Sequence, residues 1–247
     1  MSIKSILISQ PAQTNNTAYA DLTAKYGVTI NFMPFFRVEP LNAKEFRAQK
    51  INILNFTAIV FTARTTIDAF FKICEELRIA VPEDMKYFCI SESIALYLQK
   101  HIVYRKRKIF FGNGTAASIP DIIGTKHKDE KFLIASTENQ KTDLHKLFAK
   151  AKFKFDSAAF VKTIVSDLTQ TDLHKYHIIV VYTPQDVKAL LENYPEFEQK
   201  KIIFAAFGSA SAKALKAAKL APQILAPTPE APSMTKALEL YLASAKK

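Results

Sequence analysis

A short pattern of apolar and polar positions recurs along the chain and predicts the same local structure each time. Three to five apolar residues are followed by small, mostly hydroxyl-bearing residues, and then by a stretch whose apolar positions lie three and four apart. An apolar run of this length is typical of a buried strand, and the longer period is typical of an amphipathic helix. Copies begin at Ile6, Ala58, Tyr87, Phe132, Ile178 and Ile202. The alternation predicts an α/β protein built on parallel sheets.

The individual elements follow from this pattern. Strands are expected over 4–8, 28–32, 58–61, 87–90, 108–111, 132–135, 178–182, 202–206 and 223–225. Helices are expected over 14–25, 65–78, 91–101, 142–151, 185–193, 210–219 and 233–245. The helix over 65–78 carries one apolar stripe, made of Ile67, Phe70, Phe71, Cys74 and Leu77. A stripe with this spacing predicts a face packed on the core.

Two extended segments, 34–40 and 159–165, break the pattern because neither leads into a hydroxyl turn and a helix. Each lies at the border of one set of repeats, which predicts that a second domain is inserted into the first. We expect a discontinuous first domain (1–35 and 167–247), an inserted domain (41–158), and a two-stranded hinge (36–40 and 159–166). Ligands of two-domain proteins commonly bind in the cleft between the domains, so the site is expected there.

The recurring turns predict where a ligand binds. Each turn ends with free backbone N–H groups at a helix N-terminus, where the helix dipole favours negative charge. Several such turns imply a ligand with several negative groups, held by main chain and hydroxyls. The expected binding residues are the hydroxyl-bearing residues of six turns: Thr62, Ser91, Thr115, Ser136, Thr183 and Ser211. Three nearby acids, Glu92, Glu138 and Asp186, are interpreted as first-turn residues that complement helix dipoles.

The net charge of +11 is compatible with nucleic acid, an anionic membrane surface or an acidic small molecule as the partner. The densest cluster, 105–108, has no zinc-finger, helix-turn-helix, RNP or KH motif beside it, and we interpret it as an exposed loop before a strand. A positive field that attracts a polyanionic small molecule fits the charge equally well. The five histidines have no metal-binding spacing, and the sequence contains no nucleophile elbow, Walker loop or dinucleotide-binding glycine motif.

The expected compartment is the cytoplasm. No apolar run approaches the roughly 20 residues that a membrane span needs. Residues 1–4 lead directly into a strand-like stretch, with no signal-peptide pattern. Cys74 and Cys89 lie in apolar contexts and are expected to be buried, reduced thiols.

Four segments of the chain resemble one known family. Residues 59–71 resemble the V-F-T-S-x-x-A-V-x-x-F-F segment of uroporphyrinogen-III synthases. Residues 89–95 are similar to that family's I-G-x-x-T-A turn, and residues 207–215 to its I-G-x-x-T-A-x-A-L motif. Residues 226–235 resemble its final P-x-P-x-x-x-x-M/L segment, in the form of Bacteroidetes-type members. The four motifs occur in the family's order along the whole chain.

The resemblance implies a cofactor-free hydro-lyase of tetrapyrrole and haem synthesis. Such an enzyme takes hydroxymethylbilane, expels its terminal hydroxyl, inverts ring D and closes the macrocycle to uroporphyrinogen III. The substrate bears eight carboxylates, which suits several helix N-termini. The resemblance also implies a monomer without metal, nucleic-acid or membrane partners, to which hydroxymethylbilane synthase could hand over the substrate.

Several positions depart from the family pattern. Val161 stands where the V-Y-x-T hinge strand has a tyrosine credited with assisting hydroxyl departure. Ala63 replaces a serine, and residues 183–186 replace the usual S-P-S-G turn, whereas Ser211 keeps the hydroxyl of its motif. The residues therefore name no catalytic acid. Three hypotheses remain open: an active synthase, a non-catalytic two-domain protein that binds a polyanionic small molecule, and a nucleic-acid-binding protein.

Overall fold

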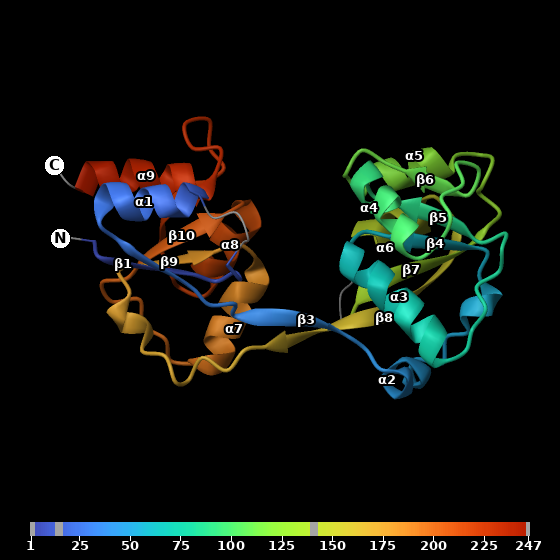
Figure 1. Ribbon diagram of the computed structural model, residues 1–247, viewed down its shortest axis with the longest axis horizontal. Helices are drawn as coiled ribbons and strands as arrows, with labels where there is room; N and C mark the ends of the chain where they lie inside the picture. The colour runs from blue at the N-terminus through green and yellow to red at the C-terminus, as the bar shows by residue number, and fades with distance from the viewer. Residues whose placement is uncertain (1–2, 13–16, 139–142, 246–247) are drawn as a thin grey trace. The chain divides into compact units, whose positions relative to one another are not determined.

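The computed structural model describes residues 3–12, 17–138 and 143–245. The chain divides into two compact units, each with its own sheet (Figure 1). The first unit joins the two ends of the chain, Met1–Arg37 and Ile164–Lys247, and the second comprises Val38–Thr163. The prediction of two α/β domains, the first of them discontinuous, is confirmed.

The first unit is a five-stranded sheet in the order β11-β10-β9-β1-β2, and all its strand pairs are parallel. The strands are β1 (Ser5–Ile8), β2 (Thr29–Phe32), β9 (Ile178–Val181), β10 (Ile203–Phe207) and β11 (Pro222–Ala226). Its helices are α1 (Thr17–Tyr26), α7 (Pro184–Asn193), α8 (Ser209–Ala217) and α9 (Met234–Ala245), with a short 3₁₀ helix at Leu173–Lys175.

Apolar residues on both sides of the central strands explain the layers of this unit. In β9, Ile179 and Val181 pack with α7 and α8, whereas Ile178 and Val180 pack with α1 and α9. A strand covered on both faces needs a continuous apolar run, because successive side chains point to opposite faces. The run at 178–181 is therefore the signature of a strand in the middle of three layers.

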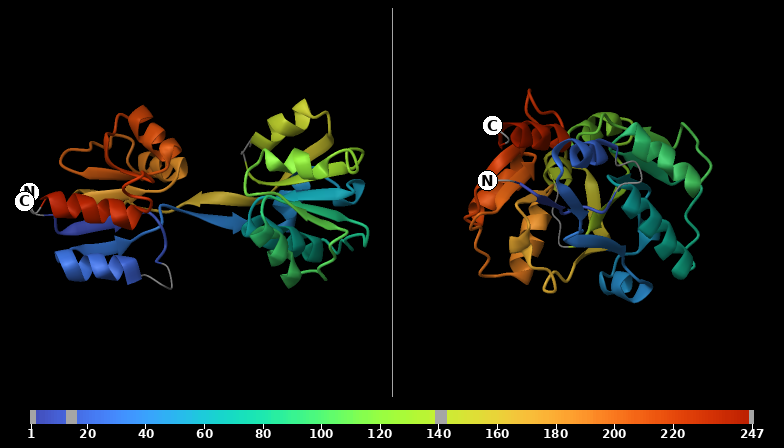
Figure 2. Two further views of the ribbon diagram at one scale, coloured as in Figure 1. Left: turned by 90° about the horizontal axis from the view of Figure 1, so that it is seen from above. Right: turned by 60° about the vertical axis from the view of Figure 1, so that its left-hand side comes forward.

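The second unit is a six-stranded sheet in the order β3-β8-β7-β4-β5-β6. The strands are β3 (Phe36–Pro40), β4 (Ala58–Phe61), β5 (Lys86–Cys89), β6 (Ile109–Phe111), β7 (Lys131–Thr137) and β8 (Lys154–Val165). Its helices are α2 (Ala43–Ala48), α3 (Arg64–Glu76), α4 (Glu92–Tyr97), α5 (Ser118–Ile123) and α6 (Asp143–Lys150), with 3₁₀ turns at Ile53–Asn55 and Leu98–Lys100. Helices α5 and α6 cover the face opposite to α3 and α4 (Figure 2).

The two extended segments of the sequence are β3 and β8, which are neighbours in the second sheet. The Leu41 amide donates to the Phe160 carbonyl, and the Ser166 amide donates to the Phe35 carbonyl. As one residue number rises the other falls, so these two segments run antiparallel. The strand pairs from β8 through β7, β4 and β5 to β6 are parallel. Strand β8 is longer than its predicted segment because it begins at Lys154.

All the predicted helices and strands have counterparts within the described residues. The structure adds two short helices and shortens one that was expected. Helices α2 and α5 were not predicted, because six residues are too short to show a helical period. The α2 cap was nonetheless readable, since Asn42 and Glu45 form a capping box. The helix expected over 91–101 is the six-residue α4 followed by a 3₁₀ turn. Residues 14–16 and 142 of two predicted helices lie outside the described residues.

Five described residues other than glycine have a left-handed backbone, and all five are basic: Lys50, Arg78, Lys152, Lys200 and Lys219. Four of them follow the last turn of a helix closely, namely α2, α3, α6 and α8. This position usually carries glycine, and a cation there complements the negative end of the helix dipole. Helices α3, α6 and α8 connect parallel strands and run antiparallel to them, so the cations after these helices lie at the amino-terminal edges of the sheets. Lys50 lies at the same edge, because it lines a hollow with Lys131 and Lys154, the first residues of β7 and β8.

Candidate functional site

The predicted site residues gather at the carboxyl-terminal edges of the two parallel sheets. Thr62, Ser91 and Thr115 follow β4, β5 and β6 in the second unit. Thr183 and Ser211 follow β9 and β10 in the first unit. Within each sheet the carboxyl ends of parallel strands share one edge, which is where open α/β sheets bind ligands. The prediction that one ligand bridges the two domains stays a prediction.

Two long helices begin at these edges without any side-chain cap. Helix α3 has Ala63 at its N-cap, and α8 has Gly208 there with a φ of 82°. Neither N-cap residue accepts a hydrogen bond through its side chain. The first N–H groups of a helix have no partner inside the helix, so an uncapped N-terminus offers donors to an anion. Thr62 is half-buried directly before the α3 cap, and Ser209 is exposed at the start of α8.

The next two predicted turns have hydroxyls engaged in local contacts. Ser91 is the N-cap of α4, and its hydroxyl lies 3.1 Å from that of Ser93 without capping the helix. The Thr115 hydroxyl donates to Asn113 Oδ1 at 2.7 Å. Gly112 permits this loop, because a Cβ there would lie 2.0 Å from Ser118 Oγ. The loop at 112–115 is therefore ordered by its own side chains.

The structure places two predicted residues differently from their expected turns. Ser136 lies inside β7, since that strand continues to Thr137, and its hydroxyl donates to the Ala158 carbonyl at 3.1 Å. Ser211 is 1% exposed, and its hydroxyl donates to the Tyr182 carbonyl at 2.8 Å. Both hydroxyls thus hold the backbone in place instead of facing solvent.

The three acids near the turns differ in whether they lie in the first turn of a helix. Asp186 and Glu92 lie in the first turns of α7 and α4, as the sequence predicts. Glu138 does not lie in a helix, because α6 begins at Asp143; its amide donates to the Val161 carbonyl at 2.8 Å. The interpretation of Glu138 as a first-turn acid is therefore wrong.

The turn after β9 is organised around the Asp186 carboxyl. One oxygen, Oδ2, accepts the Tyr182 and Thr183 amides at 2.9 and 2.7 Å and the Thr183 hydroxyl at 3.1 Å. Burial raises the pKa of Asp186, and the Thr183 and Tyr182 amides partly offset this rise. The sequence predicts this acid and its dipole role but not its burial: Asp186 is 1% exposed.

A tyrosine pair adjoins the same turn. The hydroxyls of Tyr19 and Tyr182 lie 2.6 Å apart, and the Tyr182 ring packs against Phe207. Burial raises the pKa of both phenols. No sequence signal connects Tyr19 with Tyr182, because the two are 163 residues apart.

Val161, at the position of the family's tyrosine, is 2% exposed and belongs to the core of the second unit. The register of β7 and β8 shifts here, since Ser136 pairs with Ala159 but Thr137 pairs with Val161. Phe160 is the extra residue of this bulge, and it is buried as well. The bulge places two consecutive side chains in the core.

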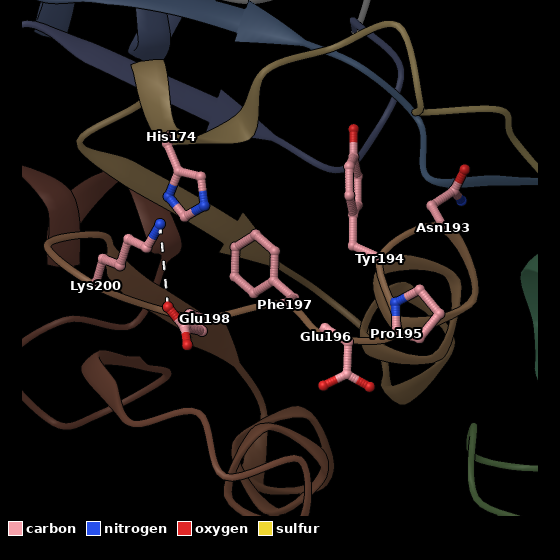
Figure 3. Close-up of a pocket in the computed structure, with 8 residues that line it drawn as sticks. All are labelled: His174, Asn193, Tyr194, Pro195, Glu196, Phe197, Glu198 and Lys200. Atoms are coloured by element: carbon pink, nitrogen blue, oxygen red, sulfur yellow. Dashed lines mark ion pairs between the residues drawn. The ribbon is translucent and has the colours of Figure 1, made fainter.

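A hollow on the first unit lies away from these turns (Figure 3). It has a volume of about 370 Å³, and its lining comes from the loop after α7 and from the 3₁₀ helix before β9. The His174 and Phe197 rings stack at 5.5 Å on one side, and Lys200 points to Glu198 at 4.0 Å. The lining contains none of the predicted site residues.

Other chemistry is sparse in the described part of the chain. It contains no group of three histidine, cysteine or acidic residues that could hold a metal ion. It also contains no helix long and apolar enough to cross a membrane. Cys74 and Cys89 are buried and unpaired, as expected, and burial raises the pKa of each thiol to about 12. The basic cluster at 105–108 is a largely exposed turn before β6, as expected.

Comparison with known proteins identifies the family of this chain. The family model described as "Uroporphyrinogen-III synthase HemD" matches residues 17–236. The chain belongs to the uroporphyrinogen-III synthase family. This family consists of hydro-lyases of tetrapyrrole biosynthesis. A comparison with curated protein sequences finds no match.

Solved structures of uroporphyrinogen-III synthases share the fold. A mutant enzyme from the extreme thermophile Thermus thermophilus is 13% identical with a TM-score of 0.60, and the alignment covers 98% of this chain and 99% of that one. The enzyme from Helicobacter pylori is 16% identical with the same TM-score, over 98% of this chain and 100% of that one. At these identities the likeness concerns the two-domain α/β fold alone. The Bacteroidetes-type subtype stays a prediction.

Proposed function

We propose that this protein is an active uroporphyrinogen-III synthase. It converts hydroxymethylbilane into uroporphyrinogen III by loss of the terminal hydroxyl, inversion of ring D and closure of the ring. Family membership over 17–236 carries this proposal. The uncapped N-termini of α3 and α8 support it, because they supply N–H donors at sheet edges where anions bind.

The proposed role of these turns is to hold substrate carboxylates. Each exposed helix N-terminus contributes about 0.3–1 kcal/mol toward an anion, so affinity is spread over many contacts. Departure of the hydroxyl leaves a cation on the substrate, which its own pyrroles stabilise. Positive charge beside that cation would raise the activation barrier for hydroxyl departure. Neutral N–H and O–H donors hold the carboxylates without adding such charge.

Incubation with hydroxymethylbilane tests the proposal directly. An active synthase forms the product isomer in which ring D is inverted, whereas unassisted closure gives the isomer without inversion. Resolving isomers I and III by chromatography measures the fraction that the protein directs. An unchanged isomer ratio with and without folded protein contradicts the proposal.

A second candidate is a non-catalytic protein that binds a polyanionic small molecule. It is favoured by the burial of Val161 where relatives have a tyrosine, and by the acid at position 186. This candidate predicts saturable binding of hydroxymethylbilane, seen as a shift in melting temperature, without any isomer III. The isomer assay and the binding assay together separate the two functions.

We further propose that the protein works as a cytoplasmic monomer and that hydroxymethylbilane synthase hands it the substrate. Of these points, family membership supports only the substrate, hydroxymethylbilane. Light scattering behind size-exclusion chromatography at several concentrations tests the oligomeric state. A mass of twice 27.8 kDa that persists on dilution contradicts a monomer.

A further inference from the structure

The turn after β9 differs from the open starts of α3 and α8 because the amides of two of its residues already bind an acid of the chain. Tyr182 and Thr183 direct their amides to Asp186, and Pro184 at the first helical position has no N–H. By contrast, α3 and α8 begin without a side-chain cap. The anion that would occupy the end of β9 is therefore part of the chain itself.

Burial distinguishes Asp186 from an ordinary capping residue. The residue is 1% exposed, and Ser9, at the end of the neighbouring strand β1, is 3% exposed. Ser9 lies close enough to lower the pKa of Asp186, yet Asp186 Oδ1 and Ser9 Oγ both lack a hydrogen-bond partner of good geometry among the described residues. A buried polar atom without a partner is rare, so these two atoms set this turn apart from the rest of the core.

Burial raises the pKa of Asp186, and its hydrogen-bond partners act against that rise. Two amides and one hydroxyl all donate to the same oxygen, Oδ2. Three donors on one oxygen are the pattern of an ionised carboxylate, because each bond to the charged form is stronger than a neutral one. The positive end of the α7 dipole adds to this preference.

We propose that the Asp186 carboxylate is a built-in anion that fills the carboxylate site at the end of β9. The turn is therefore closed to carboxylates of the substrate, a statement that rests on the proposed function. Removing the carboxylate opens a site for a free carboxylate, held by the Tyr182 and Thr183 amides and the Ser9 hydroxyl. Substrate recognition in this chain thus falls on the remaining turns.

Chemical rescue with formate tests the proposal without substrate or catalysis. Asp186→Ala removes the carboxylate and leaves two amides without an acceptor, so we expect the melting temperature to fall by ~5–10 °C. Sodium formate, compared with sodium chloride at equal ionic strength, is expected to raise the melting temperature of this variant by ~2–4 °C. Formate should leave the wild-type protein unchanged, because its site is filled.

Two variants serve as controls. Asp186→Asn keeps one acceptor oxygen and fills the space, so formate should not stabilise it. Glu45→Ala removes the matched acid of the other capping box, in α2, where the side chain is more exposed and water replaces the carboxylate. Formate should not stabilise this variant either.

Each outcome decides the proposal. Selective rescue of Asp186→Ala supports it, as does refolding of this variant in formate when it does not fold in chloride. Equal effects of formate on wild type and Asp186→Ala overturn it, as does failure of formate in every assay. An inactive protein that shows selective rescue would contradict the proposed function and leave this proposal standing.

Discussion

At the scale of single residues, the chain uses two chemically similar caps in opposite electrostatic settings. Glu45 and Asp186 are both the third residue of a capped helix. The pKa of Glu45 is lowered, chiefly by its hydrogen bond from Lys162 and then by the Asn42 amide. The pKa of Asp186 is raised by burial. The two acids occupy the same position of the same motif, but their opposite pKa shifts predict opposite dependences of stability on pH.

We expect the stability difference between wild type and Asp186→Asn to favour wild type more as the pH falls toward about 4, the ordinary pKa of an aspartate. A raised pKa means that the folded state binds the proton more readily than the unfolded state does. Protonation of Asp186 therefore stabilises the fold at low pH, and this stabilisation is lost as the pH rises through the pKa of the folded state. Glu45→Gln should show the reverse, because a lowered pKa gives stability that is lost as the pH falls. Urea unfolding at pH 4, 5.5 and 7 measures both differences. Parallel pH profiles for the two pairs would contradict these assignments.

Val161 offers a second test at this scale. Tyrosine is larger than valine, and Val161 packs in the core of the second unit. We expect Val161→Tyr to lower the free energy of unfolding by ~1–3 kcal/mol through overpacking, without a gain in turnover. Unfolding in urea and the isomer assay measure the two effects. A faster variant with unchanged stability would mean that the new ring points out of the core.

At the scale of elements, the open N-terminus of α3 is one of the two helix starts to which we assign the binding of substrate carboxylates. The N-cap residue Ala63 has φ −146° and ψ 152°, which is the backbone conformation of a capping residue. We expect Ala63→Asp to stabilise the protein by ~0.5–1 kcal/mol, because its carboxylate accepts the free amides. The same change should weaken hydroxymethylbilane binding, since it puts a negative charge where a substrate carboxylate binds.

Ala63→Ser is the matched control for this prediction. It caps the same amides with a neutral hydroxyl, so it should stabilise the helix and weaken binding less. Calorimetry with hydroxymethylbilane and urea unfolding measure the two effects. Equal binding by all three proteins would show that α3 does not take part in substrate binding.

The sequence predicted the elements better than it predicted the site. Strands such as 58–61 and 178–181 were readable because buried strands leave continuous apolar runs. The places of Ser136 and Ser211 were not readable, because a serine suits both an open turn and a bond to a buried carbonyl. The burial of Asp186 and its meeting with Ser9 depend on strand order, which local patterns do not encode.

At the scale of the whole molecule, the positive charge is not confined to the proposed site. Five of the cations occupy left-handed positions, and the four that follow helices lie at the amino-terminal sheet edges, away from the hydroxyl turns. The net charge of +11 therefore attracts anions to the whole protein more than it binds an anion at one site. Binding at the proposed turns should depend on directed N–H donors and weakly on these five residues.

Those five positions also make the protein's charge adjustable. Asparagine tolerates a left-handed backbone better than lysine or arginine does. We expect replacement of all five by asparagine to lower the net charge from +11 by five charges, with a free energy of unfolding that stays within ~1 kcal/mol per site. Urea unfolding and retention on a cation exchanger measure the two effects, and a matched set of five exposed helical lysines, changed in the same way, should lose helix stability instead. A formulation or crystallisation effort could thus change the isoelectric point of this protein at positions where the backbone itself favours the exchange.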